Sequence, residues 1–289
     1  MSLPRFDRLI SILFSGSLPG ENGRSAGQRL PILMYHSVSN EAEPGLKSYY
    51  HISTNPARFS EHLDWLSELG YTGMALEEAV GKIAAGTLNG TAPVALTFDD
   101  GFQDFHEYAW PALQRHGFTA TVYLPTALIS NERKAFRGKE CLTWREVCQL
   151  RQQGIRFGSH TVNHPTLYQL PWSEIEYETR ISKQRIEQEL QEEVTSFAYP
   201  FAFPQEDDYF RGRLRGLLSN VGYTSCVTTM IGRAQVGDDP YSLKRLPASS
   251  FDDKALFAAK LSGAYDWVGQ VQRVFRCLKK RRKGQAKTN

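Results

Sequence analysis

The chain has 289 residues, of which 41% are hydrophobic and 22% are charged, and its formal net charge is +3. This composition supplies a sizeable core and excludes a disordered chain, and the length suits one large domain such as an α/β barrel. The net charge is too small to indicate a nucleic-acid partner, and none is expected.

The four cysteines, at positions 141, 148, 226 and 277, form no CxxC pair. Neither a thiolate zinc site nor a disulfide framework is therefore expected. The apolar run at residues 9–14 is shorter than the core of a signal peptide and too short to cross a bilayer. We expect a cytoplasmic location, either free or peripheral at the inner face of the membrane.

Strand-like and helix-like patterns alternate from residue 31 onwards. The patterns predict strands at 31–38, 94–100, 119–126, 155–162, 194–201, 222–230 and 241–249. They predict helices at 55–70, 106–117, 143–154 and 173–193, the last with Ser173 and Glu176 in capping-box spacing. This alternation indicates an α/β fold with a parallel sheet, and seven or eight such units predict a closed barrel.

Both ends of the chain lie outside this pattern. We divide the sequence into an N-terminal amphipathic segment and linker (1–29), the barrel (30–260), and an amphipathic helix with a basic tail (261–289). The terminal segments carry apolar residues at helical spacing next to basic residues, and such helices can lie on an anionic membrane. The alternative is that the apolar stripes dock on the barrel and the basic tail is solvated.

Several predicted strands end in polar residues, among them His36, Asp99-Asp100, His160 and Arg245. In a parallel barrel, the C-terminal strand ends lie on one face, where barrel active sites are found. Residues that are far apart in the sequence are therefore expected to converge.

The stretches "LTFDDGF" (96–102) and "GSHTVNHP" (158–165) carry the candidate chemistry. His160 and His164 are four residues apart, which on a helical turn would place both imidazoles on one side. One carboxylate and two imidazoles make a three-ligand set for a divalent ion, with zinc as the first choice and cobalt, nickel, iron or manganese also suited. Adjacent strand residues point in opposite directions, so one of Asp99 and Asp100 could bind the ion while the other accepts a proton.

At this point the residues resemble the polysaccharide deacetylase family, also called the NodB-homology domain. The segments that carry the resemblance are "TFDDG" (97–101), "HTVNHP" (160–165) and "FAYPF" (197–201), within a match of roughly residues 30–250. The resemblance implies a distorted (β/α) barrel that removes N-acetyl groups from amino sugars with a divalent metal. It implies Asp99 as general base, Asp100, His160 and His164 as metal ligands, and the backbone N–H of Phe201 as oxyanion donor.

The sequence departs from the commoner pattern of the family at two places. Ala198 stands where an arginine is often found, and the strand at 243–247 has no histidine to protonate the leaving amine. A branch that includes poly-N-acetylglucosamine deacetylases is similar in its early "MYH" strand, which here is residues 34–36. By that resemblance His36 is the general acid and Arg245 the charge partner of Asp99.

The remaining histidines are weighed against His36. His51 and His106 are the alternatives for the general acid, whereas His62 and His116 lie on predicted helices and are expected at the surface.

The expected activity is hydrolysis of N-acetyl groups on a poly- or oligosaccharide. Alternatives are a deacetylase or deformylase of a lipid- or nucleotide-linked amino sugar, and a non-catalytic carbohydrate-binding barrel. A glycosidase fits poorly, because its two carboxylates must lie on the order of 5 Å or more apart across the scissile bond. Residues 131–144 are expected to form a loop over the site.

Overall fold

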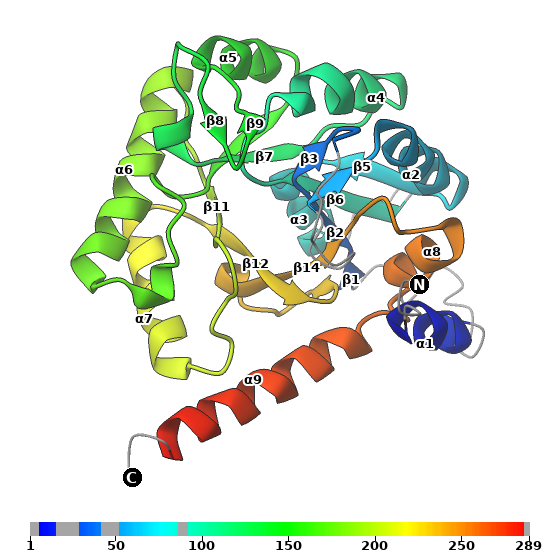
Figure 1. The fold of residues 1–289 in the computed structure, drawn as a ribbon. Coiled ribbons are helices and arrows are strands. Elements are labelled where there is room, and N and C mark those ends of the chain that lie inside the picture. Colours follow the sequence, from blue (N-terminus) through cyan, green and yellow to red (C-terminus); the bar gives the residue numbers. More distant parts are fainter. Residues whose placement is uncertain (1–5, 16–28, 42–51, 86–91, 286–289) are drawn as a thin grey trace.

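Seven parallel strands form a closed barrel in the computed structural model, which describes residues 6–15, 29–41, 52–85 and 92–285 (Figure 1). The order around the ring is β2-β14-β12-β11-β10-β7-β6, and β2 pairs with β6 to close it. The bounds are β2 Ile32–Tyr35, β6 Ala92–Phe98, β7 Thr121–Leu124, β10 Arg156–Ser159, β11 Ser196–Ala198, β12 Ser225–Ile231 and β14 Leu243–Pro247. The predicted α/β barrel is confirmed.

An eighth strand, β5 (Tyr71–Met74), pairs with the first half of β6, while β7 pairs with its second half. The strand β5 thus extends the sheet without entering the closed ring. Neither β5 nor the following helix α3 (Leu76–Ala84) was predicted. The strand "YTGM" is short and contains a glycine, so its apolar pattern is weak.

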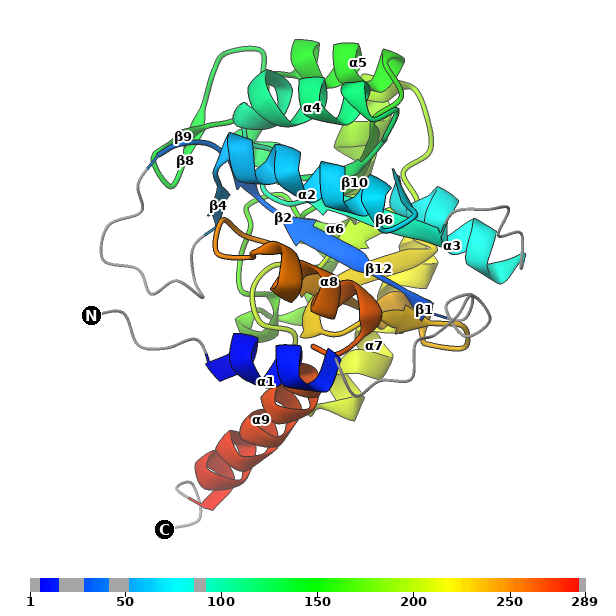
Figure 2. The same ribbon diagram turned by 90° about the vertical axis from the view of Figure 1, so that its right-hand side faces the viewer.

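Helices surround the barrel (Figure 1). They are α2 Pro56–Glu68, α4 Trp110–Arg115, which continues the π-helix η3 Phe105–Ala109, α5 Trp144–Gln152, α6 Trp172–Leu190, α7 Asp208–Val221 and α8 Lys254–Ser262. The terminal helices α1 (Phe6–Ser15) and α9 (Trp267–Gln285) lie together at one end of the molecule (Figures 1 and 2). Within the described part of the chain, none of the helices has both the length and the apolarity needed to span a membrane.

Short strand pairs and turns complete the fold. β1 (Arg29–Leu30) pairs with β13 (Ala234–Gln235), β3 (Ser37–Val38) with β4 (Ser53–Thr54), and β8 (Ala135–Phe136) with β9 (Lys139–Glu140). Three 3₁₀ turns are also described: η4 Thr126–Leu128, η5 Leu167–Gln169 and η6 Pro240–Ser242.

Local sequence explains where several helices begin. Asn55 caps α2 through its side-chain oxygen, with Pro56 at the first helical position. Thr143 and Glu146 form a capping box on α5. The capping box predicted for α6 is wrong, because that helix begins at Trp172 after Pro171, and no side chain caps it.

The barrel strands are almost fully buried because helices cover them from outside and side chains fill the inside. In β6, every residue after Ala92 is buried. Charged side chains begin where the strand ends, at Asp99 and Asp100, and this change positions the site.

Candidate metal centre and active site

One carboxylate and two imidazoles meet at the C-terminal ends of the barrel strands. Single ligand atoms of Asp100, His160 and His164 all lie within 4.8 Å of one another, and all three residues are buried. The Oδ1 atom of Asp100 lies 3.2 Å from His164 Nε2 and 3.6 Å from His160 Nε2. The structure therefore brings together the three residues that the sequence assigns to the metal.

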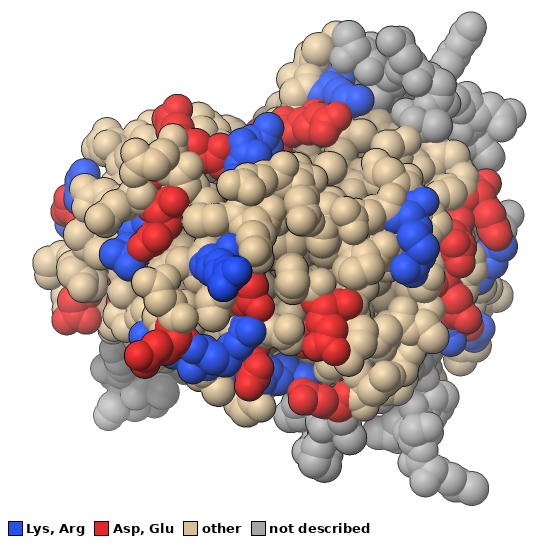
Figure 3. Space-filling model, turned by 90° about the horizontal axis from the view of Figure 1, so that it is seen from above, with Lys and Arg blue, Asp and Glu red and all other residues tan. Residues whose placement is uncertain are grey.

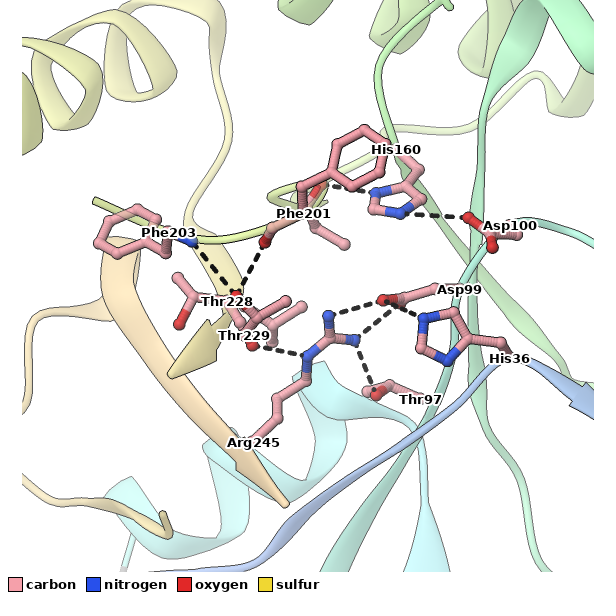
Figure 4. Close-up of polar contacts among 12 residues, drawn as sticks. His36, Thr97, Asp99, Asp100, His160, Phe201, Phe203, Thr228, Thr229 and Arg245 are labelled. Carbon is pink, nitrogen blue, oxygen red and sulfur yellow. Dashed lines mark hydrogen bonds and ion pairs between the residues drawn. The ribbon is translucent and has the colours of Figure 1, made fainter. Parts of the chain in front are cut away.

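The backbone explains why Asp99 and Asp100 point apart. Asp99 still belongs to the sheet, since its N–H donates to the Tyr35 carbonyl at 3.0 Å. Asp100 has a φ of 72°, in the left-handed region, and Gly101 follows at 61°. The chain turns sharply at Asp100 and carries its carboxylate toward the imidazoles of His160 and His164. The carboxylate of Asp99 points instead to Arg245 (Figure 4).

The loop that carries both histidines is not a helical turn, so the expected reason for their proximity is wrong. Thr161 and His164 have φ values of 71° and 54°, in the left-handed region. Thr161 Oγ1 accepts a hydrogen bond from the His164 N–H at 2.9 Å. The two imidazoles converge through this tight loop, and their ring centroids lie 4.7 Å apart.

The His160 ring is fixed by a hydrogen bond. Its Nδ1 lies 2.7 Å from the Ala198 carbonyl, which can only accept, so Nδ1 carries the proton. The lone pair of Nε2 then faces Asp100, which is the tautomer a metal ligand requires. Burial lowers the pKa of His160 to about 4, so the ring is neutral at physiological pH.

The charge state of Asp100 also suits a cation. Burial alone would raise its pKa, but His164 beside it and the other nearby imidazoles outweigh burial and lower the pKa. Its Oδ1 atom is buried without a hydrogen-bond partner among the described residues. A deprotonated carboxylate and neutral imidazoles are the forms that bind a metal, and a cation would satisfy this oxygen.

A guanidinium from β14, which only β2 separates from β6 in the ring, holds Asp99 (Figure 4). Arg245 Nη1 and Nη2 each donate to one Asp99 oxygen at 2.7 Å, and both side chains are buried. Arg245 also donates from Nε to the Thr228 carbonyl and from Nη1 to Thr97 Oγ1. Burial alone would raise the pKa of Asp99, but the charge of Arg245 outweighs burial and holds this pKa far below its ordinary value.

The other proposed participants lie close by. His36 Nε2 lies 3.9 Å from Asp99 Oδ2, and the His36 side chain is 23% exposed, so it faces both Asp99 and solvent. The Phe201 ring packs on His164 at 4.6 Å between centroids. Phe201 has a φ of 57°, and its N–H makes no hydrogen bond to the residues described.

The alternative histidines fall elsewhere. His106 lies on η3 and forms no side-chain hydrogen bond or ion pair within the described part of the chain, and His51 lies outside that part. His116 is half-buried at the end of α4, near Asp64.

The surface position expected for His62 is wrong, because the residue is fully buried on the inner face of α2. Its Nδ1 accepts from the Tyr35 hydroxyl at 3.0 Å and its Nε2 donates to the Asp252 carbonyl at 3.3 Å. The ring also stacks on Phe257. Both ring nitrogens are thus satisfied inside the core, which lets a histidine take a core position.

Comparison with known proteins agrees with this geometry. The family model "Polysaccharide deacetylase" matches residues 89–225. The chain is 28% identical over 231 residues to the Bacillus subtilis (strain 168) protein named "Putative polysaccharide deacetylase YxkH", covering 80% of this chain and 75% of that one. The chain belongs to the polysaccharide deacetylase family.

Solved structures of other proteins share the fold of this polysaccharide deacetylase family member. The Streptococcus pyogenes deacetylase PplD, solved in complex with acetate, is 27% identical and superposes with a TM-score of 0.69 over 81% of this chain and 98% of that one. IcaB from Ammonifex degensii, at 20% identity, has a TM-score of 0.67 over 82% of this chain and 98% of that one. At that identity the likeness to IcaB shows the fold alone.

A buried glutamate that the sequence analysis missed shapes the histidine loop of this polysaccharide deacetylase family member. Glu178, on α6, accepts from the Val162 and Asn163 N–H groups at 2.7 and 2.9 Å and from Asn163 Nδ2 at 2.7 Å. The available signal was a glutamate between Ile175 and Ser182 on the buried side of a long helix. An acid there needs buried donors, and the loop supplies them.

The hairpin of β8 and β9 forms one wall of the site, as expected for a loop at 131–144. Its two-residue turn, Arg137-Gly138, has φ values of 51° and 81°, which suits a tight hairpin. Phe136 packs on His164 at 5.2 Å between centroids. The His164 ring is therefore positioned between Phe136 and Phe201 by packing, because its buried Nδ1 has no hydrogen-bond partner among the described residues.

Proposed function

We propose that the protein is a metal-dependent hydrolase that removes N-acetyl groups from N-acetylated amino sugars of a poly- or oligosaccharide. The observation that carries this proposal is the buried group of Asp100, His160 and His164 beside an ionised Asp99. Family membership supports an acetylated glycan as substrate class. The similarity to PplD, a deacetylase solved in complex with acetate, supports the same chemistry by analogy.

The three ligands suit a borderline divalent cation, and we propose zinc, with cobalt, nickel, iron or manganese as alternatives. When bound, such a cation supplies Lewis acidity toward a carbonyl oxygen and toward water. The remaining chemistry falls to the chain's own residues.

In the proposed reaction, a water oxygen bonds to the acetyl carbon and Asp99 accepts its proton. The N–H of Phe201 donates to the oxyanion that forms. His36 then gives a proton to the sugar nitrogen as the carbon–nitrogen bond breaks, so that a free amine and acetate leave. Arg245 keeps Asp99 ionised and oriented, so the carboxylate enters this step in the form that can take up a proton.

Two observations favour His36 over the other histidines as the proton donor. Its ring lies 3.9 Å from Asp99, and it is partly exposed, so a substrate can reach it. His106 makes no contact with Asp99 or Asp100 among the side-chain interactions of the described residues. His51 stays an untested alternative.

The finer identity of the substrate is open to alternatives. A lipid- or nucleotide-linked amino sugar, deacetylated or deformylated, would use the same residues, and a non-catalytic glycan-binding barrel would need none of them to react. We keep a cytoplasmic location as a proposal, together with peripheral contact at an anionic membrane.

The test is release of acetate from a panel of N-acetylated saccharides, with and without a chelator. We expect release that stops on chelation, returns with added divalent metal, and leaves the sugar chain uncleaved. Asp99→Asn should lower turnover by about a hundredfold or more with its metal content intact. His160→Ala should lose both metal and turnover, and His116→Ala, which alters an imidazole outside the site, should lose neither.

The proposal fails in two recognisable ways. A protein that carries no divalent ion and gains none would favour the binding barrel. A metal-loaded Asp99→Asn variant with near-normal turnover would remove Asp99 from the proton transfer.

A further inference from the structure

The N-terminal helix α1 docks on the protein through polar contacts, with Ile10 and Ile12 partly buried beside them. Arg8 Nε donates to Asp253 Oδ2 at 2.8 Å, which ties the helix to the start of α8. Ser11 is fully buried, and its Oγ accepts from Trp267 Nε1 at 3.0 Å. These contacts fix which side of α1 faces the body of the protein.

One apolar stripe of the same helix is left in solvent. Phe6, Leu9 and Leu13 are all exposed, Leu13 to 75%, and their spacing of three and four residues places them on one stripe. An ordinary surface helix buries its apolar stripe and exposes its polar one. At these three positions α1 does the opposite, which argues against docking of this stripe on the barrel.

The C-terminal helix α9 repeats this arrangement. Gln272 faces the barrel, where its Oε1 accepts from the Ile231 N–H and its Nε2 donates to the Thr229 carbonyl, both at 3.2 Å. Gly269 lets the helix come close, because a Cβ there would lie 2.0 Å from the Ile231 carbonyl oxygen. The docked side of α9 therefore combines Gln272 and Gly269 with the partly buried Trp267 and Val268.

The opposite side of α9 carries an exposed apolar stripe. The stripe consists of Val271, Val274, Phe275 and Leu278, and Phe275 is 61% exposed. Their spacing of three, four and seven residues keeps them on one side of the helix. We call the seven exposed large hydrophobic residues of α1 and α9 the terminal apolar surface: Phe6, Leu9, Leu13, Val271, Val274, Phe275 and Leu278.

The two stripes belong to one end of the molecule. The Trp267–Ser11 hydrogen bond joins the beginning of α9 to α1, and Tyr265 also donates to Asp7 at 3.1 Å. Figures 1 and 2 both show α1 beside the start of α9, with the rest of α9 extending away from the barrel.

The positive charge of the C-terminal segment favours an anionic partner for this surface. From residue 267 to the end the sequence contains eight lysines and arginines and no acid. The face in Figure 3, which lies away from α1 and α9, instead mixes both signs. A second copy of the chain would bring two such cationic segments together, which is unfavourable, whereas an anionic lipid surface attracts them.

We infer that the terminal apolar surface inserts into the interface of an anionic lipid bilayer, to which the positive charge of the sequence at 267–289 attracts the protein. Apolar side chains on one side and cations along the same helix are the features of peripheral interfacial helices. The inference is independent of the proposed reaction, because it uses no residue of the metal centre.

The test is flotation of the full-length protein with vesicles of phosphatidylcholine alone or mixed with phosphatidylglycerol. We expect binding to the mixed vesicles only, weakened by added salt. The variants Phe6→Ser/Leu9→Ser/Leu13→Ser and Val274→Ser/Phe275→Ser should each lower the partition coefficient about tenfold or more. A control variant at two exposed apolar residues elsewhere, Tyr209→Ser/Val236→Ser, should bind as the unaltered protein does.

Three results would overturn the inference. One is equal recovery of the unaltered protein in the unbound fraction with both kinds of vesicle. Another is full binding by both sets of serine variants. The third is a dimer by light scattering that the same variants abolish, which would assign the surface to self-association. All substituted side chains are exposed, so circular dichroism should report an unchanged fold, and flotation needs no activity.

Discussion

Replacing Glu178 with glutamine tests how the loop that carries His160 and His164 is held. The carboxylate accepts three hydrogen bonds from Val162 and Asn163, and it is buried. Glutamine has nearly the same shape, but its amide nitrogen cannot accept, so the change removes the charge and one of the two acceptor oxygens. Hydrogen bonds to a charged group contribute roughly 1 kcal/mol more than neutral ones, which gives about 3 kcal/mol over three bonds.

We expect this loss to appear partly as a lower free energy of unfolding and partly as weaker metal binding. The loop sets the position of both imidazoles, and loss of a group that orients metal ligands typically weakens binding by about 10- to 100-fold. We expect Glu178→Gln to lower zinc affinity within this range in a chelator-competition titration. The free energy of unfolding in urea, measured without metal, should fall by about 1–3 kcal/mol.

The matched control is Glu176→Gln, two positions away on the same helix. Glu176 is exposed and pairs with Arg180, and a surface pair of this kind contributes about 0.3–0.5 kcal/mol. The Glu176→Gln variant should bind zinc with unchanged affinity. Equal zinc affinity of Glu178→Gln and the unaltered protein would refute the claim that Glu178 positions the ligands.

Three further predictions concern His62, Gly269 and Arg245. The folded-state pKa of His62 is lowered, mainly by burial, from 6.5 to about 4, so its neutral form is favoured by folding. Stability should therefore be unaffected above pH 6.5 and fall by up to about 3 kcal/mol as the pH drops toward 4. His62→Phe should flatten this acid dependence in urea unfolding, and an unchanged slope would contradict it. Gly269→Ala should destabilise the protein by about 1–3 kcal/mol, because its Cβ meets the Ile231 carbonyl; Gly212→Ala, on α7 with open space around it, should not. Arg245→Gln leaves Asp99 buried without its partner, so we expect a loss of about 3–5 kcal/mol at pH 7. The pKa of Asp99 should rise in this variant, since the largest charge that opposes burial is then gone, and the loss should shrink in acid. A loss that does not vary with pH would show that Asp99 is not the group affected.

The sequence predicts the barrel and the convergence of its polar strand ends for a simple reason. Buried parallel strands have continuous apolar runs, and the first polar residues after each run mark one face of the sheet. Asp99 and Asp100 are such residues, and the chain brings them to His160 and Arg245 from other strands. This reasoning uses only the parallel direction of the strands and needs no side-chain detail.

The structural detail of the site was less predictable. His160 and His164 meet because Thr161 and His164 have positive φ values. Non-glycine residues rarely adopt such values, so the sequence gives no sign of this turn. Glu178 and His62 are polar residues on buried helix sides, and each is accepted because distant backbone groups or a hydroxyl satisfy it. Such partners come from the tertiary fold, so a pattern within one helix does not reveal them.

Arg245 lies on the last strand of the ring, whereas Asp99 follows a strand near its beginning. The guanidinium can reach the carboxylate only after β14 has taken its place between β12 and β2. The ion pair between Asp99 and Arg245 therefore forms only when the barrel is complete. An incompletely synthesised chain ending before residue 243 could gather its histidines, yet it would leave Asp99 without a counter-charge.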